Sequence, residues 1–183
     1  MHYTLCDMFS DLTQNAFEAV SNLITVELKQ DDREISIKIE DNGKGMSPEE
    51  LKKATDPFYS DGIKHPGRKV GLGIPFLIQT ADETGGSWNI RSETGQGTVV
   101  DARFDLTNID TPPVGDVTGF FRQILTFDGR YEMVIRRKTP TLEYTVKRSE
   151  LLEALELEEE GSFTDANSLA LLGMYLESME SST

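Results

Sequence analysis

The chain has 183 residues, with 18 lysines and arginines against 32 aspartates and glutamates and a formal net charge of −14. This length suits one domain, or one domain with a smaller addition. The acidity argues against general nucleic-acid binding, which needs a basic surface. No apolar run approaches the roughly 18 residues that a membrane helix requires.

The N-terminus and the cysteine content indicate a cytoplasmic protein. Residues 1–3 show no cationic and apolar leader. The single cysteine, Cys6, excludes an intrachain disulfide, and two histidines with one cysteine are too few for a usual zinc site. Cys6 lies in an apolar stretch, which favours a buried and unreactive thiol.

Helical spacing of apolar residues predicts a first helix over about residues 8–23. On its opposite side, Asp11, Asn15, Glu18 and Asn22 fall within about 60° of one another and form a polar stripe. Such a stripe is usually a solvated helix face, so its spacing alone does not establish a site.

Alternating residues over 25–29 and 34–40 then predict a β-hairpin. Ser47 and Glu50 form the pattern of a capping box that opens a short helix. A further helix over residues 74–84 and strands over 88–91 and 98–104 follow. We therefore predict an α+β fold, a two-layer α/β sandwich with helices on one face of a mixed, mostly antiparallel sheet.

The composition changes after residue 106. Residues 107–115 contain many turn formers and are predicted to be a linker between a domain over 1–106 and a small C-terminal α+β extension over 116–183. In the extension we expect helices over 120–125, 150–157 and 165–179 and strands over 131–135 and 142–146. The last helix has an apolar stripe that either packs on its own domain or forms a homodimer or partner surface: Leu169, Leu172, Leu176 and Met179.

Three glycine clusters interrupt this pattern in an informative order. Asp41-Asn-Gly-Lys-Gly45-Met46 follows a strand, Gly71-Leu-Gly73 precedes a helix, and Gly95-Gln-Gly97-Thr98 precedes a strand. With the asparagine-bearing first helix, this set resembles the Bergerat-fold ATP-binding family of gyrase B, histidine kinases and MutL over roughly residues 8–106. The part after Pro57 is most similar to the ATPase domain of sensor histidine kinases. The resemblance implies ATP and Mg²⁺ as ligands.

The first and last clusters carry the residues expected at adenine. The Asp41 carboxylate can accept a hydrogen bond from the exocyclic amine of adenine, which distinguishes adenine from guanine. Gly43 and Gly45 let the backbone approach the base, and the Thr98 hydroxyl can support its edge. The resemblance also assigns Met46 to the nucleotide site.

The phosphates are expected near the start of the helix at Ile74. Gly71 and Gly73 expose backbone N–H groups there, where the helix dipole favours anions, and Leu72 lies between them. Asn15 offers an amide oxygen to Mg²⁺, which binds through few protein ligands plus phosphates. Residues 59–70 resemble the ATP lid, whose cations either reach the phosphates or face solvent: Lys64, Arg68 and Lys69.

Asp11 is the candidate general base. It precedes Asn15 by one helical turn and matches in charge the catalytic glutamate of the gyrase and MutL branches, although it is one methylene shorter. The sequence therefore leaves ATP hydrolysis open. We also expect no internal phosphoacceptor hairpin, because the first helix begins near the N-terminus.

These features predict a stand-alone Mg-ATP-dependent regulatory protein. As an enzyme, it would be a protein kinase acting in trans on a partner, or a slow ATPase. The alternative is a non-catalytic ATP-sensing module in which the order of the lid controls a protein partner.

Overall fold

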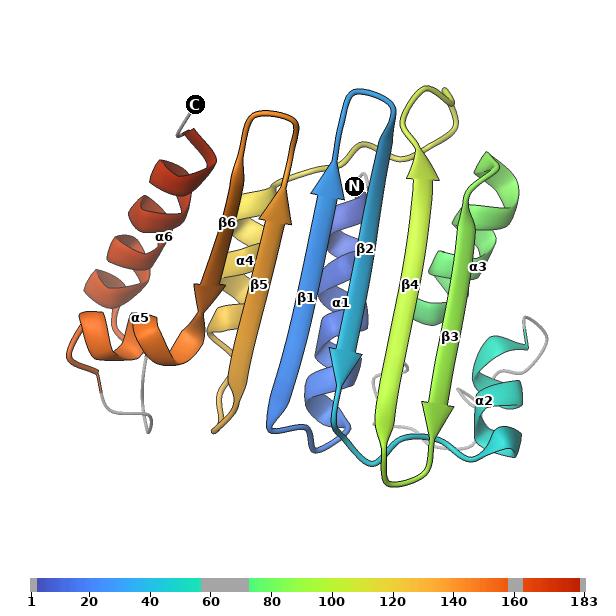
Figure 1. Cartoon of the computed structure of the whole chain (residues 1–183), viewed down its shortest axis with the longest axis horizontal. Helices are drawn as coiled ribbons and strands as arrows, with labels where there is room; N and C mark the ends of the chain where they lie inside the picture. The colour runs from blue at the N-terminus through green and yellow to red at the C-terminus, as the bar shows by residue number, and fades with distance from the viewer. Residues whose placement is uncertain (1–2, 57–72, 158–162, 182–183) are drawn as a thin grey trace.

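The computed structural model describes residues 3–56, 73–157 and 163–181, which form one six-stranded sheet with a layer of helices (Figure 1). The strand order is β3-β4-β2-β1-β5-β6. Helices α1, α3 and α4 lie behind the sheet in this view, while the face toward the viewer carries no helix. The predicted α+β sandwich with helices on one face of a mixed sheet is confirmed.

Helix α1 (Leu5–Glu18) begins at a capping box, in which the Thr4 side chain accepts from the Asp7 backbone N–H and the Asp7 carboxylate accepts from the Thr4 N–H. The predicted C-terminus at residue 23 is wrong. Val20 has a φ of 61°, so the helix stops before it and the chain turns into β1. Asn22 is therefore not part of the polar stripe on α1.

The predicted hairpin consists of β1 (Leu23–Gln30) and β2 (Glu34–Asp41), which pair antiparallel. In its turn, Asp31 Oδ1 accepts the backbone N–H groups of Arg33 and Glu34. Strand β2 also pairs with β4 (Gly97–Asp105), and β4 pairs with the edge strand β3 (Ser87–Glu93). The inward residues of the hairpin are fully or almost fully buried against the helices: Ile24, Val26, Leu28, Ile35, Ile37 and Ile39.

Two more helices accompany this part of the sheet. Helix α2 (Pro48–Thr55) begins at the predicted capping box of Ser47 and Glu50. Helix α3 (Gly73–Thr84) contacts α1 and lies across β3 and β4.

The C-terminal segment extends the same sheet. After α4 (Val117–Leu125), strand β5 (Glu132–Lys138) pairs parallel to β1, and β6 (Glu143–Lys147) pairs antiparallel to β5. Helices α5 (Arg148–Ala154) and α6 (Ala166–Ser181) follow. The hydrophobic core runs continuously from the N-terminal part into this segment, so α4, β5, β6, α5 and α6 extend the layers formed by the preceding helices and strands. The division into two domains stays a prediction.

Two arginines fix the C-terminal segment from inside. Arg148 is 1% exposed and donates to the carbonyl oxygens of Leu125 at 3.1 Å and Tyr131 at 3.0 Å, with its guanidinium 4.2 Å from the Tyr131 ring centre. Arg137 is 4% exposed and donates to Glu180 Oε1 of α6 at 2.9 Å. Breaking either set of bonds would leave buried polar groups without partners.

The apolar stripe of α6 packs on its own chain. Leu172 and Leu176 are buried, and Leu169 and Met179 are partly buried against the core. Cys6 is buried as expected, and burial raises the pKa of its thiol to about 12. A thiol with this pKa is protonated at neutral pH, consistent with an unreactive residue.

Candidate functional site

A cavity of about 260 Å³ opens between α1 and the ends of β2 and β4 on the helix-covered side of the sheet. It brings together five of the residues that the sequence predicts for the nucleotide: Asn15, Asp41, Gly45, Met46 and Thr98. Apolar side chains complete its walls, including those of Leu12, Ile39, Ile74 and Val100. A mostly apolar cavity with a few polar groups is typical of a small-molecule site.

Asp41 is the most deeply placed polar residue of this cavity, with 7% of its surface exposed. Its Oδ1 accepts the Gly43 backbone N–H at 2.8 Å and lies 3.1 Å from the Ser21 hydroxyl, which also contacts the Ala16 carbonyl oxygen at 2.6 Å. Burial raises the pKa of Asp41, and these donors oppose that shift. A hydrogen bond from the Thr98 backbone N–H to the carboxylate opposes it as well. Gly43 and Ser21 thus fix Oδ1, while the carboxylate keeps acceptor capacity for a ligand.

Glycines let three backbone segments meet around Asp41. A Cβ at Gly43 would lie 2.5 Å from the Ala19 carbonyl oxygen and 2.9 Å from Asp41 Oδ1. Gly97 has a φ of 95°, and a Cβ there would overlap the Asp41 carbonyl group. Both positions therefore exclude any side chain, because the neighbouring atoms belong to the backbone or to Asp41 itself.

Thr98 is held in a hydroxyl network beside Asp41. Its Oγ1 lies 2.7 Å from the Ser92 hydroxyl oxygen, which accepts the Met46 backbone N–H at 2.8 Å. Thr98 and Asp41 are also register partners on β4 and β2. The network links the strand that carries Thr98 to the segment that carries Gly45 and Met46.

Asp11 lies outside the lining of the cavity, toward the start of α3. The Tyr3 hydroxyl donates to its Oδ2 at 2.9 Å, and the Tyr3 ring lies 4.9 Å from that of Phe76 on α3. A Cβ at Gly73 would approach the Leu12 backbone nitrogen at 3.1 Å and Asp11 Cβ at 3.2 Å. The absence of a side chain at Gly73 thus lets the N-terminus of α3 lie against Asp11.

A family model matches residues 3–108, which are more than half of the chain, and it describes the histidine kinase-, DNA gyrase B- and HSP90-like ATPases. The chain belongs to this family. It accordingly contains an ATP-binding domain of the histidine-kinase-like ATPase type.

Curated relatives match the same part of the chain. A putative sensor histidine kinase NtrY-like protein of Rickettsia conorii is 31% identical over 55% of this chain and 17% of its own length. Sporulation kinase C of Bacillus subtilis is 33% identical over 52% of this chain and 22% of its own length. The chain thus spans about a fifth of the length of these two relatives. The similarity supports the ATPase domain and does not extend to the activity of the whole relatives.

A similar solved structure is the N-terminal domain of a DNA repair protein. The two chains align with a TM-score of 0.48 and 14% sequence identity, over 79% of this chain and 51% of that one.

Among the described residues, none of the helices has the length and apolar character needed to cross a membrane.

Part of the predicted ATPase site lies outside the described residues. This applies to the cationic lid over 59–70, to Pro57 and Phe58, and to five predicted nucleotide ligands: Lys64, Arg68, Lys69, Gly71 and Leu72. Their assignment stays a prediction. The described part comprises the residues predicted to contact adenine and the α1 face beside them.

The structure adds residues that the sequence reasoning missed. Ile39 and Val100 line the cavity two positions from Asp41 and Thr98, on the same strand faces, so the period of two could have revealed them. Lys44 also lines the cavity, and its backbone N–H donates to the Ala19 carbonyl oxygen at 2.9 Å. Ser21 gave no sequence signal, because its role depends on a turn that brings it to Asp41.

Proposed function

We propose that this cavity binds Mg-ATP with its adenine at Asp41, and that the protein is a regulatory kinase acting in trans or a slow ATPase. The observation that carries the proposal is the buried Asp41 carboxylate. Gly43 and Ser21 donate to Oδ1, and the carboxylate, with about four lone-pair sites, can still accept the exocyclic amine of adenine. The flat apolar walls suit a purine ring.

The groups available around the cavity fit the rest of a nucleotide. Asn15 contributes an amide oxygen suitable for Mg²⁺, and Lys44 contributes a cation at the rim. A bound Mg²⁺ would supply positive charge to the phosphates. Asn15 would hold the ion on the protein side, while Gly73 and the start of α3 would offer backbone N–H groups to the phosphates.

Asp11 would act as the general base if ATP is hydrolysed. Its Oδ2 accepts the Tyr3 hydroxyl, so Oδ1 is the oxygen that would take a proton from water. Tyr3 would fix the orientation of the carboxylate and keep it beside α3. In a kinase reaction, the same carboxylate would accept the proton of the partner's hydroxyl or imidazole group.

The second candidate function is a non-catalytic ATP-sensing module. One observation favours it: Asp11 does not line the cavity that contains Asp41 and Asn15. In this function, ATP binding would order the lid and change the affinity for a protein partner.

Calorimetric titration with ATP and GTP tests the binding site. We expect Asp41→Asn to weaken ATP binding at least about tenfold, because a charged hydrogen bond contributes about 1.5–3 kcal/mol. Asp105→Asn, which changes an exposed carboxylate at the far end of β4, is the matched control. Unchanged ATP affinity in a folded Asp41→Asn protein would refute the adenine assignment.

Labelled γ-phosphate separates the two candidate functions. An enzyme releases phosphate or labels a partner, and Asp11→Asn should lower this rate at least about a hundredfold while preserving ATP affinity. The absence of both products, in the presence of partners captured with ATP, would favour the sensing module.

A further inference from the structure

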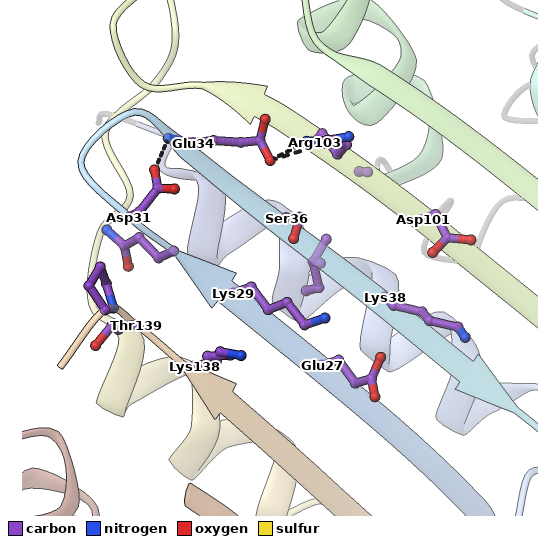
Figure 2. Close-up of a pocket in the computed structure, with 14 residues that line it drawn as sticks. Glu27, Lys29, Asp31, Glu34, Ser36, Lys38, Asp101, Arg103, Lys138 and Thr139 are labelled. Atoms are coloured by element: carbon purple, nitrogen blue, oxygen red, sulfur yellow. Dashed lines mark hydrogen bonds and ion pairs between the residues drawn. The ribbon is translucent and has the colours of Figure 1, made fainter. Parts of the chain in front are cut away.

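The face of the sheet opposite the helices carries a polar groove that the nucleotide site does not use. The groove has a volume of about 620 Å³ and lies between the β1–β2 turn, the β5–β6 turn and β4 (Figure 2). Its floor is formed by the outward side chains of β1, β2, β4 and β5, including Lys29, Ser36 and Lys138. Because the ATP cavity lies on the other side of the sheet, the groove is a separate feature of the molecule.

The carboxylates of the groove are already engaged. Glu27 pairs with Arg136 at 3.1 Å, and Glu34 pairs with Arg103 at 2.6 Å. The other two are Asp101, which lies 3.6 Å from an Arg91 nitrogen, and Asp31, which accepts two backbone N–H groups of its turn. Three of the four carboxylates therefore have an arginine of the sheet within 4 Å, and Asp31 is held by its turn.

In contrast to these carboxylates, two lysines of the groove lack an ion-pair partner among the described residues. Lys29 and Lys138 are exposed and are register partners on the adjacent parallel strands β1 and β5, whose backbones lie about 5 Å apart. Neither makes an ion pair with any residue in the described part of the chain, although Glu143 is the register partner of Lys138 on β6. Like charges directly opposite one another destabilise a sheet. An anionic group bound between the two lysines would relieve their mutual repulsion.

We propose that the groove binds an acidic segment of a partner protein, with carboxylates of that segment on Lys29 and Lys138. The hydroxyls of Ser36 and Thr139 border the lysines and can bond the backbone of an extended peptide. In such a peptide every second side chain faces the same way, about 6.6–6.8 Å apart, so alternate acidic residues would face the groove.

The chemistry of the lining favours a peptide over other anions. A nucleic acid would bring a dense row of phosphates, and the two lysines that lack an ion pair among the described residues are too few to neutralise it. A single small anion would fill little of the 620 Å³ groove.

Fluorescence anisotropy with a labelled peptide of alternating Glu and Ser tests the proposal on the whole chain. We expect binding that weakens with salt and is at least about tenfold weaker for a peptide with Gln in place of Glu. The double variant Lys29→Glu, Lys138→Glu should weaken binding at least about tenfold. The control Lys52→Glu, Lys53→Glu makes the same charge change on α2 and should bind like the wild type.

Several results would overturn the proposal. These are equal binding of the Gln peptide, equal loss in the α2 control, displacement of the peptide by millimolar inorganic phosphate, or tighter binding of a DNA duplex. A monomer–dimer equilibrium that the groove variant abolishes would assign the groove to self-association and would also overturn it. ATP titration of the groove variant should match the wild type, so a failure here is distinguishable from a failure of the nucleotide site.

Discussion

Gly43→Ala offers a sharp test of how backbone packing orients Asp41, the carboxylate proposed to bind adenine. The new methyl group would lie 2.5 Å from the Ala19 carbonyl oxygen, 2.7 Å from Ser21 Oγ and 2.9 Å from Asp41 Oδ1. All three atoms belong to the cluster that orients Asp41, and relieving the overlap requires Asp41 or the Ala19–Ser21 turn to shift. Overpacking of this kind costs about 1–3 kcal/mol of stability.

The displaced carboxylate should also lose its bond to adenine. We expect ATP affinity to fall about 10- to 100-fold, which corresponds to the loss of one charged hydrogen bond. Calorimetry measures the affinity, and urea unfolding measures the stability of the same protein.

Gly95→Ala is the matched control for this test. Gly95 has a φ of 80° but has no atom within 4 Å of a new Cβ, so its substitution strains the backbone without crowding Asp41. We expect a loss of about 1 kcal/mol in the free energy of unfolding and unchanged ATP affinity. If both variants weaken ATP binding equally, or if Gly43→Ala leaves it unchanged, the proposed coupling between packing and recognition is wrong.

Three further predictions concern stability and pH. Arg148→Met should lower the free energy of unfolding by about 3–5 kcal/mol, because it removes buried donors from backbone carbonyl groups. Urea titration measures this loss, and a value below about 1 kcal/mol would contradict the reasoning. Val20→Gly should raise it by about 1 kcal/mol, since glycine relieves the positive φ and Val20 is 84% exposed; a lower thermal midpoint would argue against strain. The raised pKa of Asp41 means that the ligand-free wild type loses stability as pH rises from the ordinary carboxyl pKa, near 3.9, through the raised value. The stability of Asp41→Asn relative to the wild type should therefore increase between pH 4 and pH 7, and a flat or falling difference would refute the raised pKa.

The sequence predicted the elements whose causes are local. The alternation over the β1–β2 hairpin and the Ser47–Glu50 capping box each depend on residues a few positions apart, and both were found as predicted. The glycine spacing around Asp41 and Thr98 also indicated residues that the structure brings together in one cavity, while their role at adenine stays a prediction. The alternation of apolar and polar residues along each strand also predicted which side chains face the core.

What the sequence could not predict depends on distant segments. The parallel pairing of β5 with β1 joins residues more than a hundred positions apart and makes the extension part of one sheet. The same pairing creates the opposition of Lys29 and Lys138, which no local pattern reveals. Asp11 was predicted from its helical offset and its resemblance to the glutamate of the gyrase and MutL branches, but its bond to Tyr3 depends on how the N-terminal residues lie beside α1.

The error at the end of α1 has a physical cause that concerns the site. Apolar periodicity continues past Glu18, yet the helix ends there because Val20 adopts a positive φ, which is unfavourable for a β-branched residue. Its two neighbours explain why the turn is retained: the Ala19 carbonyl oxygen accepts the Lys44 N–H, and the Ser21 hydroxyl reaches Asp41. A helix continuing through residue 23 could not make both bonds. The strain at Val20 is therefore offset by contacts that orient Asp41, the residue proposed to bind adenine. Strained backbone of this kind is common at functional sites.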